Sequence, residues 1–331
     1  MFNQDHHRIG FACKFEETAV PNIKTTTITW LNSATRDKAV QKLKGLMDHN
    51  LNALYQQVKY IASRPPNQRM FRISSDVLPA YTHDDWAWFY WEPDVVAELE
   101  RDFMAVGDLA REHDVRLSFH PGQFCVLGSE NPDVVENSIQ EFEYHADMIR
   151  YMGFGKTFQD FKCNINIGGK AGPTGFKKAL SKLSTVARNC ITVENDEFKW
   201  GIDSSLELVE DCALVLDIHH HWIRTGEYIE PTDDRVKRMM DSWRGVRPVL
   251  HYSLSREEVI GDYWDPFMLP DLQELVDDHG YTKTKLRAHS DYYWNMASNR
   301  WCYEFSNTHD IMLESKMKNL AHHKFCLEMF H

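Results

Sequence analysis

The chain has 331 residues, which is long enough for two average domains, although α/β barrels of this length often form one unit. It carries 37 basic residues against 49 acidic ones, a net charge of −12 that argues against a protein coating nucleic acid through bulk charge. A nuclease is not excluded, because bound cations and a local basic rim can carry phosphate contacts. With no membrane-length apolar run and no signal-peptide core, we expect a cytoplasmic, intracellular protein without membrane association.

Short apolar runs alternate with helix-like segments from the first residues to the last. The predicted strands, in chain order, are 8–13, 70–74, 115–120, 163–167, 190–194, 213–217, 248–251 and 310–314. The predicted helices are one capped near residue 32 or 33 and continued or followed by 52–61, then 93–113, 132–152, 177–188, 206–210, 232–243, 269–278 and a terminal helix to 330. The threonine-rich stretch 25–29 and the acidic, aromatic stretch 83–91 are predicted as loops. This alternation predicts a single (β/α)8 TIM barrel over residues 1–331.

Polar residues gather where several of these strands end. The segments are His120-Pro121-Gly122-Gln123-Phe124, Glu194-Asn195-Asp196-Glu197, Asp217 with His219-His220-His221, His251-Tyr252-Ser253 and Glu314-Ser315-Lys316. In a closed parallel barrel the strand ends converge on one face, so these groups would meet. Buried carboxylates without partners are costly, and a cluster of bound cations would offset their charge. A solvated, histidine-rich turn is an equal alternative for residues 214–221 alone, but five such ends together argue against it.

The donor types narrow the chemistry. Histidine and carboxylate ligands without thiolates suit Zn²⁺ or Mn²⁺ better than Mg²⁺ alone. Two such ions about 3.5–4 Å apart suit in-line phosphoryl chemistry. The seven cysteines form no CxxC pair and are expected to be reduced, and the chain has no Walker, GxGxxG or GxSxG motif.

In combination, these motifs resemble those of the UV damage endonuclease family, whose barrel is related to endonuclease IV and the xylose-isomerase-like superfamily. The matching stretches are 9–13, 71–74, 116–124, 131–136, 193–197, 217–220 and 310–316. The His-Pro-Gly-Gln-aromatic and Glu-Asn-Asp-Glu segments are the most specific of them.

The resemblance implies two or three divalent ions, with Mn²⁺ favoured and Zn²⁺ or Mg²⁺ as alternatives. Glu194, Asp217, His251 and Glu314 would surround one ion, and Glu194 would bridge to a second ion held by His120. His220 and His289 would hold a third. His83 matches a family histidine near the cluster, although an ordinary loop histidine is an equal reading.

Four positions depart from the family pattern. Asn166 stands where the family has a histidine, and an amide oxygen would ligate the second ion more weakly. Val249 replaces a lysine, Phe124 replaces a tyrosine, and Lys14-Phe15 stand where the family has an asparagine after the first strand.

The implied activity is incision of damaged double-stranded DNA immediately 5′ of UV photoproducts, with abasic sites as further substrates, leaving 3′-hydroxyl and 5′-phosphate ends. Glu194, Asp217 and Glu314 would be the catalytic carboxylates, chiefly by holding metal. Gln123 and Phe124 would wedge into the duplex at the lesion. Lys316 and Lys170 are candidates for phosphate contact, with ordinary solvated lysines as the alternative, and the protein is expected to be a monomer.

Two rival functions stay open from the sequence. A sugar isomerase or epimerase of the same superfamily would use a similar metal cluster on a polyol, and would turn over sugars while ignoring DNA. A catalytically weakened damaged-DNA binder is suggested by Asn166 and Val249, and would hold less than one metal per chain.

Overall fold

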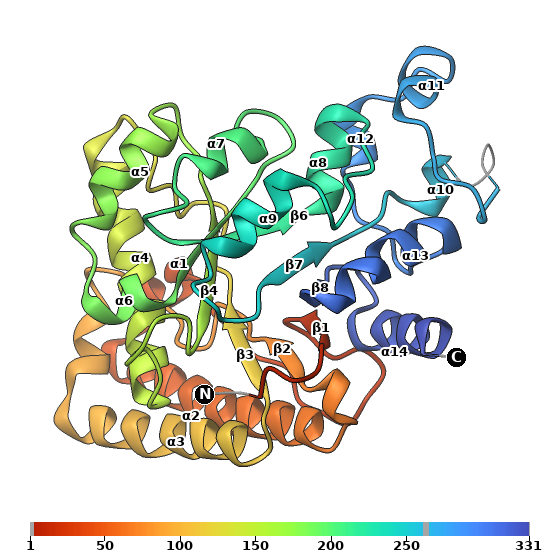
Figure 1. Cartoon of the computed structure of the whole chain (residues 1–331). Helices are drawn as coiled ribbons and strands as arrows, with labels where there is room; N and C mark the ends of the chain where they lie inside the picture. Colours follow the sequence, from red (N-terminus) through yellow and green to blue (C-terminus); the bar gives the residue numbers. More distant parts are fainter. Residues whose placement is uncertain (1–2, 261–264, 331) are drawn as a thin grey trace.

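The computed structural model describes residues 3–260 and 265–330, and it contains a closed barrel of eight parallel strands (Figure 1). Each strand pairs with the next in the chain, and β8 closes the barrel by pairing with β1. The strands are β1 Ile9–Ala12, β2 Met70–Arg72, β3 Arg116–Phe119, β4 Lys162–Asn166, β5 Ile191–Glu194, β6 Ala213–Asp217, β7 Val249–Tyr252 and β8 Asp310–Leu313. The predicted (β/α)8 architecture is therefore confirmed.

The register of the strands sets the predicted polar ends at a common level. Asn166 of β4 pairs with Glu194 of β5, and Asp217 of β6 pairs with His251 of β7. Because parallel strands all run the same way, these four residues lie around the carboxyl-terminal mouth of the barrel.

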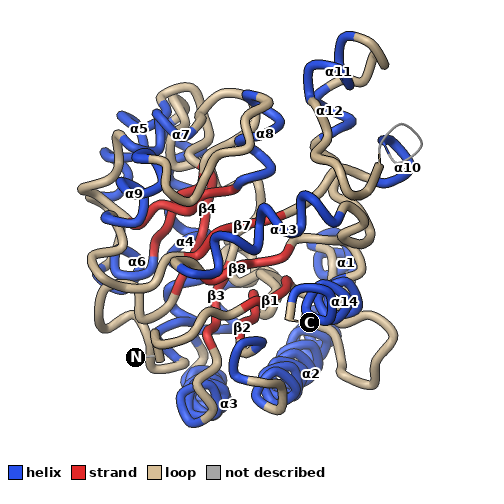
Figure 2. Tube along the Cα trace, turned by 45° about the vertical axis from the view of Figure 1, so that its right-hand side comes forward, coloured by secondary structure: helices blue, strands red, loops and turns tan. Residues whose placement is uncertain are grey.

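Helices form the outer layer around the strands (Figures 1 and 2). They are α1 Ile28–Ser33, α2 Arg36–Ala62, α3 Pro93–Glu112, α4 Pro132–Tyr151, α5 Gly172–Leu180, α6 Thr185–Cys190, α7 Ile202–Leu206, α8 Ile218–Thr225, α9 Asp234–Asp241, α10 Glu257–Ile260, α11 Leu272–Asp277, α12 Lys283–Leu286, α13 Met296–Glu304 and α14 Lys318–Met329. Their apolar faces bury a large continuous core against the strands. In α3, for example, Pro93 occupies the first turn, and Leu99, Phe103 and Val106 are fully buried.

Three stretches differ from their predicted secondary structure, and side-chain caps account for two of them. The threonine-rich stretch is helical from Ile28, because the Thr27 side chain accepts a hydrogen bond from the Trp30 backbone. The predicted helix 177–188 is two helices, and Ser184 caps the second one. The segment predicted at 206–210 is helical instead at 202–206.

The connection between β7 and β8 is a long excursion that contains α10 to α13. Figures 1 and 2 both show α10, α11 and α12 projecting away from the barrel. An isolated antiparallel bridge between Ser255 and His289 joins the outgoing and returning chains at the base of this projection. The bridge brings His289 back to the barrel mouth, although a long stretch of sequence separates it from β7. None of the helices in the described ranges is both long and apolar enough to cross a membrane.

Candidate metal centre

Three side chains from neighbouring strands form the centre of the mouth. One ligand atom each from Glu194, Asp217 and His251 lies within 4.8 Å of the other two, and all three residues are buried. Glu194 Oε2, Asp217 Oδ2 and His251 Nδ1 have no hydrogen-bond partner among the described residues. Two of these atoms lie near an imidazole nitrogen, because Glu194 Oε2 is 2.6 Å from His251 Nδ1 and Asp217 Oδ2 is 3.5 Å from His220 Nδ1. Buried ligand atoms that face one another without hydrogen bonds are an arrangement that a bound cation would satisfy.

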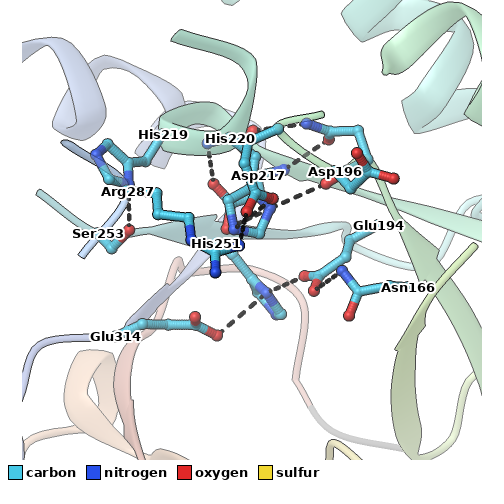
Figure 3. A network of polar contacts seen from close by, with 12 residues as sticks. Asn166, Glu194, Asp196, Asp217, His219, His220, His251, Ser253, Arg287 and Glu314 are labelled. Atoms are coloured by element: carbon cyan, nitrogen blue, oxygen red, sulfur yellow. Dashed lines mark hydrogen bonds and ion pairs between the residues drawn. The ribbon is translucent and has the colours of Figure 1, made fainter. Parts of the chain in front are cut away.

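Glu314 completes the carboxylate set from the end of β8. Its Oε1 atom lies 3.3 Å from His251 Nδ1, and Figure 3 shows the imidazole between the carboxylates of Glu194 and Glu314. Glu314 also forms an ion pair with Arg72 from β2. Burial alone would raise the pKa of the Glu314 carboxyl, but Arg72 and His251 outweigh it and hold the pKa well below its usual range.

Asp217 is held by its own backbone surroundings. Its Oδ1 atom accepts a hydrogen bond from the His220 amide at 2.8 Å, which caps α8, and this leaves Oδ2 for another partner. The Asn195 side chain bonds the Asp217 carbonyl at 2.9 Å and its amide at 3.0 Å. Burial and the nearby carboxylates raise the pKa of Asp217 to about 7, although His220 opposes them. In the absence of a cation, this site therefore disfavours the ionised carboxylate.

The three consecutive histidines of α8 have different partners. His220 Nδ1 lies 3.0 Å from the Asn195 carbonyl, and its Nε2 lies 3.8 Å from Glu197. Burial would lower the pKa of His220, but the carboxylates of Asp217, Glu194 and Glu197 raise it to about 9. His219 bonds Ser253 at 2.7 Å (Figure 3), and His221 bonds Glu227 at 2.9 Å.

The remaining predicted ligands differ in how near they lie to the cluster. His120 Nε2 lies 3.1 Å from Glu194 Oε1, and the Asn166 amide donates to that same oxygen at 2.8 Å. His289 Nδ1 bonds the Glu314 carbonyl at 2.6 Å, which orients its ring next to the cluster. His83 instead contacts Asp85 of its own loop. The geometry therefore brings together every predicted ligand except His83.

The sequence analysis missed two cations of the mouth, the partly buried Arg72 and the fully buried Lys162. Arg72 pairs with Glu314, and the Lys162 ammonium lies 2.7 Å from His251 Nε2. Burial and the Arg72 charge lower the pKa of Lys162 to about 7. The expectation that bound ions alone offset the carboxylates was therefore incomplete, because the protein supplies part of the positive charge. The available signal was Arg72, a charged residue in an otherwise apolar strand.

A cavity of about 410 Å³ opens beside the cluster. Its lining includes Gln123, Asn166, Glu194, Phe198 and His220. Phe124, which follows Gln123 in the sequence, is 84% exposed, and Lys170 is also exposed. The Lys316 ammonium lies 3.7 Å from the Asp291 carboxylate, and its side chain is also exposed. Both lysines proposed for phosphate contact therefore lie at the surface.

The comparisons with known proteins agree with this architecture. The sequence profile of UV-endonuclease UvdE matches residues 7–330. The UV DNA damage endonuclease of Bacillus velezensis is 29% identical over 271 residues, covering 76% of this chain and 80% of that protein. The protein of the same name from Bacillus cereus strain B4264 is 26% identical over 316 residues, covering 90% of this chain and 86% of that protein.

Solved structures support the fold independently. The crystal structure of SacUVDE has a TM-score of 0.71 at 24% identity and covers 98% of this chain and 96% of its own. Endonuclease IV from Thermus thermophilus has a TM-score of 0.55 at 13% identity, covering 98% of this chain and 97% of its own. Likeness at these identities shows the shared barrel. The match of the family profile along nearly the whole sequence goes further, and the chain belongs to the UV-endonuclease UvdE family.

Proposed function

We propose that the protein is a metal-dependent DNA repair endonuclease that incises immediately 5′ of UV photoproducts, and of abasic sites, leaving 3′-hydroxyl and 5′-phosphate ends. Membership of the UvdE family supports a DNA-repair endonuclease, and two of its relatives are named UV DNA damage endonucleases. The observation that carries the metal dependence is the trio of buried, converging ligand atoms without hydrogen bonds on Glu194, Asp217 and His251.

The donor set of the mouth fits divalent cations. Glu194, Asp217, His251 and Glu314 would hold one ion, His120 a second one beside Glu194, and His220 with His289 a third. Asn166 is a weaker candidate because its amide nitrogen donates to Glu194, and His83 would have to move from its own loop. Carboxylates and imidazoles together favour Mn²⁺ or Zn²⁺, with Mg²⁺ as an alternative. When bound, such ions would lower the pKa of a water molecule and offset charge developing on a phosphate.

The protein's own groups would keep these ligands in place. Asn195 fixes the backbone of Asp217, and Arg72 of β2 pairs with the Glu314 carboxylate at the end of β8, across the intervening β1. Lys162 orients His251 through its Nε2 atom, which leaves Nδ1 facing Glu194 and Glu314. A ligand set held by such outer contacts needs little rearrangement when substrate arrives.

The exposed Gln123 and Phe124 would supply the wedge at the lesion. Phe124 lacks a tyrosine hydroxyl but retains an aromatic ring, so it can still stack in a gap between bases. Lys170 and Lys316 would contact phosphates, because the chain as a whole is acidic and its DNA contacts must be local.

The test is nicking of supercoiled plasmid, UV-irradiated or unirradiated, in Mn²⁺, Zn²⁺ or Mg²⁺. We expect nicking of irradiated plasmid only, and its loss in Glu194→Ala together with reduced metal content. Glu100→Ala, at an exposed position on α3, is the control for loss of a carboxylate. If the wild type binds irradiated DNA but does not nick it in any of the three ions, the protein is a damage binder and the nuclease proposal fails.

A further inference from the structure

Phe198 is an aromatic residue that lines the cavity beside the metal centre and is not one of the proposed metal ligands. It lies in the loop between β5 and α7, four residues after Glu194, and its side chain is 50% exposed. Leaving half of a phenyl ring in water is unfavourable, and the exposed ring belongs to a cavity rather than to a flat surface. The ring is therefore available to a ligand that enters beside the metal centre.

The loop that carries Phe198 is held by several hydrogen bonds. The Asp196 carboxylate accepts from the Phe198 amide at 2.7 Å and from the Trp200 amide at 2.9 Å. Arg224 donates to the Phe198 carbonyl at 2.5 Å. The Trp200 indole donates to the Gly169 carbonyl at 2.9 Å, which ties this loop to the one after β4. A ring on such a fixed backbone is presented to a ligand at little further entropic cost.

Arg287 supports the ring of Phe198 from one side. The guanidinium carbon lies 5.1 Å from the ring centre, and the same group bonds the Glu197 carboxylate at 2.8 Å. Glu197 in turn lies 3.8 Å from His220 Nε2, so the platform is connected to the metal centre. A guanidinium over one ring face leaves the remaining exposed surface for a second flat group.

The lining of this wall fits a flat group that forms hydrogen bonds. The carboxylates of Asp196 and Glu197 stand beside the cationic Lys199 and His220, so the wall carries both signs of charge. The amides of Gln123 and Asn166 on the lining offer hydrogen bonds to such a group. Aromatic side chains stack with every nucleobase, because every base has a π face.

We propose that Phe198, backed by Arg287, is a stacking platform for a nucleobase that leaves the duplex when damaged DNA lies across the barrel mouth. This role rests on the proposed function, because it requires a DNA substrate. Phe198 would be a positioning residue, distinct from the Phe124 wedge that would open the gap.

The experiment measures equilibrium binding to a duplex with a single thymine dimer and to its undamaged counterpart. A methylphosphonate at the linkage 5′ of the dimer prevents incision, so the measurement does not depend on cleavage. We expect Phe198→Ala to weaken binding to the dimer duplex about 5- to 100-fold. Binding to the undamaged duplex and metal content should not change. Phe198→Tyr should restore dimer binding, because it keeps the ring.

Leu327→Ala is the matched control, because Leu327 is also 50% exposed but lies on the outer helix α14. If the wild type prefers the dimer duplex and Phe198→Ala binds it equally well, the platform alone is overturned. Equal losses on both duplexes, or no recovery in Phe198→Tyr, would indicate a structural role and would also overturn it. A wild type without preference for the dimer duplex would instead remove the proposed function, and the platform with it.

Discussion

The two ends of the barrel both bury charged groups, but they balance the charge in different ways. At the amino-terminal end, Asp310 at the start of β8 accepts from the Arg8 amide at 2.8 Å, from Arg116 at 2.7 Å and from Arg247 Nε at 3.0 Å. At the carboxyl-terminal mouth, Arg72 pairs with Glu314, and His220 lies 3.5 Å from Asp217. The charge of the buried Lys162 interacts with Glu194 and Glu314.

The difference lies in which atoms remain without partners. Both carboxylate oxygens of Asp310 accept hydrogen bonds from within the chain. Glu194 Oε2 and Asp217 Oδ2 have none among the described residues. Buried charge by itself therefore does not indicate a functional site, since a closed network serves stability. Buried ligand atoms that face one another without partners are the more specific sign.

The largest expected effect is at the closed end. Asp310→Asn should lower the free energy of unfolding by about 3–5 kcal/mol, because it leaves buried guanidinium groups without their anion. Chemical denaturation of the metal-loaded protein would measure the loss. Asp234→Asn, which breaks an exposed pair with Lys237, should cost less than about 1 kcal/mol. If Asp310→Asn is as stable as the wild type, the closed network does not have the structural role assigned to it.

At the open end, Asp217→Asn should separate stability from activity. Incision of irradiated plasmid should fall by more than about 100-fold, because a proposed ligand is lost. The metal-free variant should nevertheless be more stable than the metal-free wild type, by about 1–2 kcal/mol at pH 8. Asparagine can still cap α8 through its side-chain oxygen.

The raised pKa of Asp217 determines how the stability difference between Asp217→Asn and the wild type changes with pH. Because the pKa of Asp217 is raised to about 7 in the folded protein, the wild type loses stability as pH rises from about 4 through about 7. The advantage of Asp217→Asn should therefore be small at pH 4 and largest above pH 7. Glu314→Gln is the matched control. It removes a carboxylate whose pKa is lowered, so it should destabilise the metal-free protein by leaving Arg72 unpaired. Equal shifts in both variants would contradict this account of the mouth.

Much of the fold could be predicted from the sequence, because fully buried parallel strands are short apolar runs bounded by polar residues. The predicted strand 213–217 has the bounds of β6, and the other strands agree within one or two residues. Glu194, Asp217 and His251 could be placed together because strand ends of a barrel share one face. Their roles as metal ligands remain predictions.

Other features could not be predicted, because they depend on contacts distant in sequence. Arg72 contacts Glu314 just after β8, and Lys162 contacts His251 on β7. Nothing in a strand of three to five residues reveals which side chains enter the barrel. The histidines after Asp217 lie in α8, whose start depends on the Asp217 cap. In the projection, α11 lies within the predicted helix 269–278, whereas α10 and α12 have only four residues each and are too short to show a helical period.

Substitution of the exposed Phe124 at the rim of the mouth should have a smaller effect than substitution of the buried carboxylates Asp310 and Asp217. Phe124→Ala should reduce incision of irradiated plasmid by about 5- to 100-fold through lost stacking, with metal content unchanged. Phe124→Tyr keeps the ring and should incise as well as the wild type. Incision by Phe124→Ala at the wild-type rate would contradict the wedge.

The smallest effect concerns Glu141 on α4, a carboxyl with a raised pKa outside the metal centre. Burial and the neighbouring Asp76 raise its pKa from 4.5 to about 7, so the protein loses stability as pH rises through this range. Its side chain is 34% exposed, and solvent screening limits the gain from Glu141→Gln to about 1 kcal/mol at pH 8. The gain should vanish near pH 4, whereas Glu136→Gln at an exposed position of α4 should show none.

Incision by Glu141→Gln should equal that of the wild type, in contrast to Asp217→Asn. Both carboxyls have a pKa raised by burial and by other carboxylates. They differ in that Asp217 directs an unpartnered oxygen toward Glu194 and His251. Loss of incision in Glu141→Gln would contradict this distinction. It would mean that a raised carboxyl pKa, rather than the convergence of ligand atoms, marks the residues needed for incision. Retained incision with a pH-dependent gain in stability would support that distinction directly.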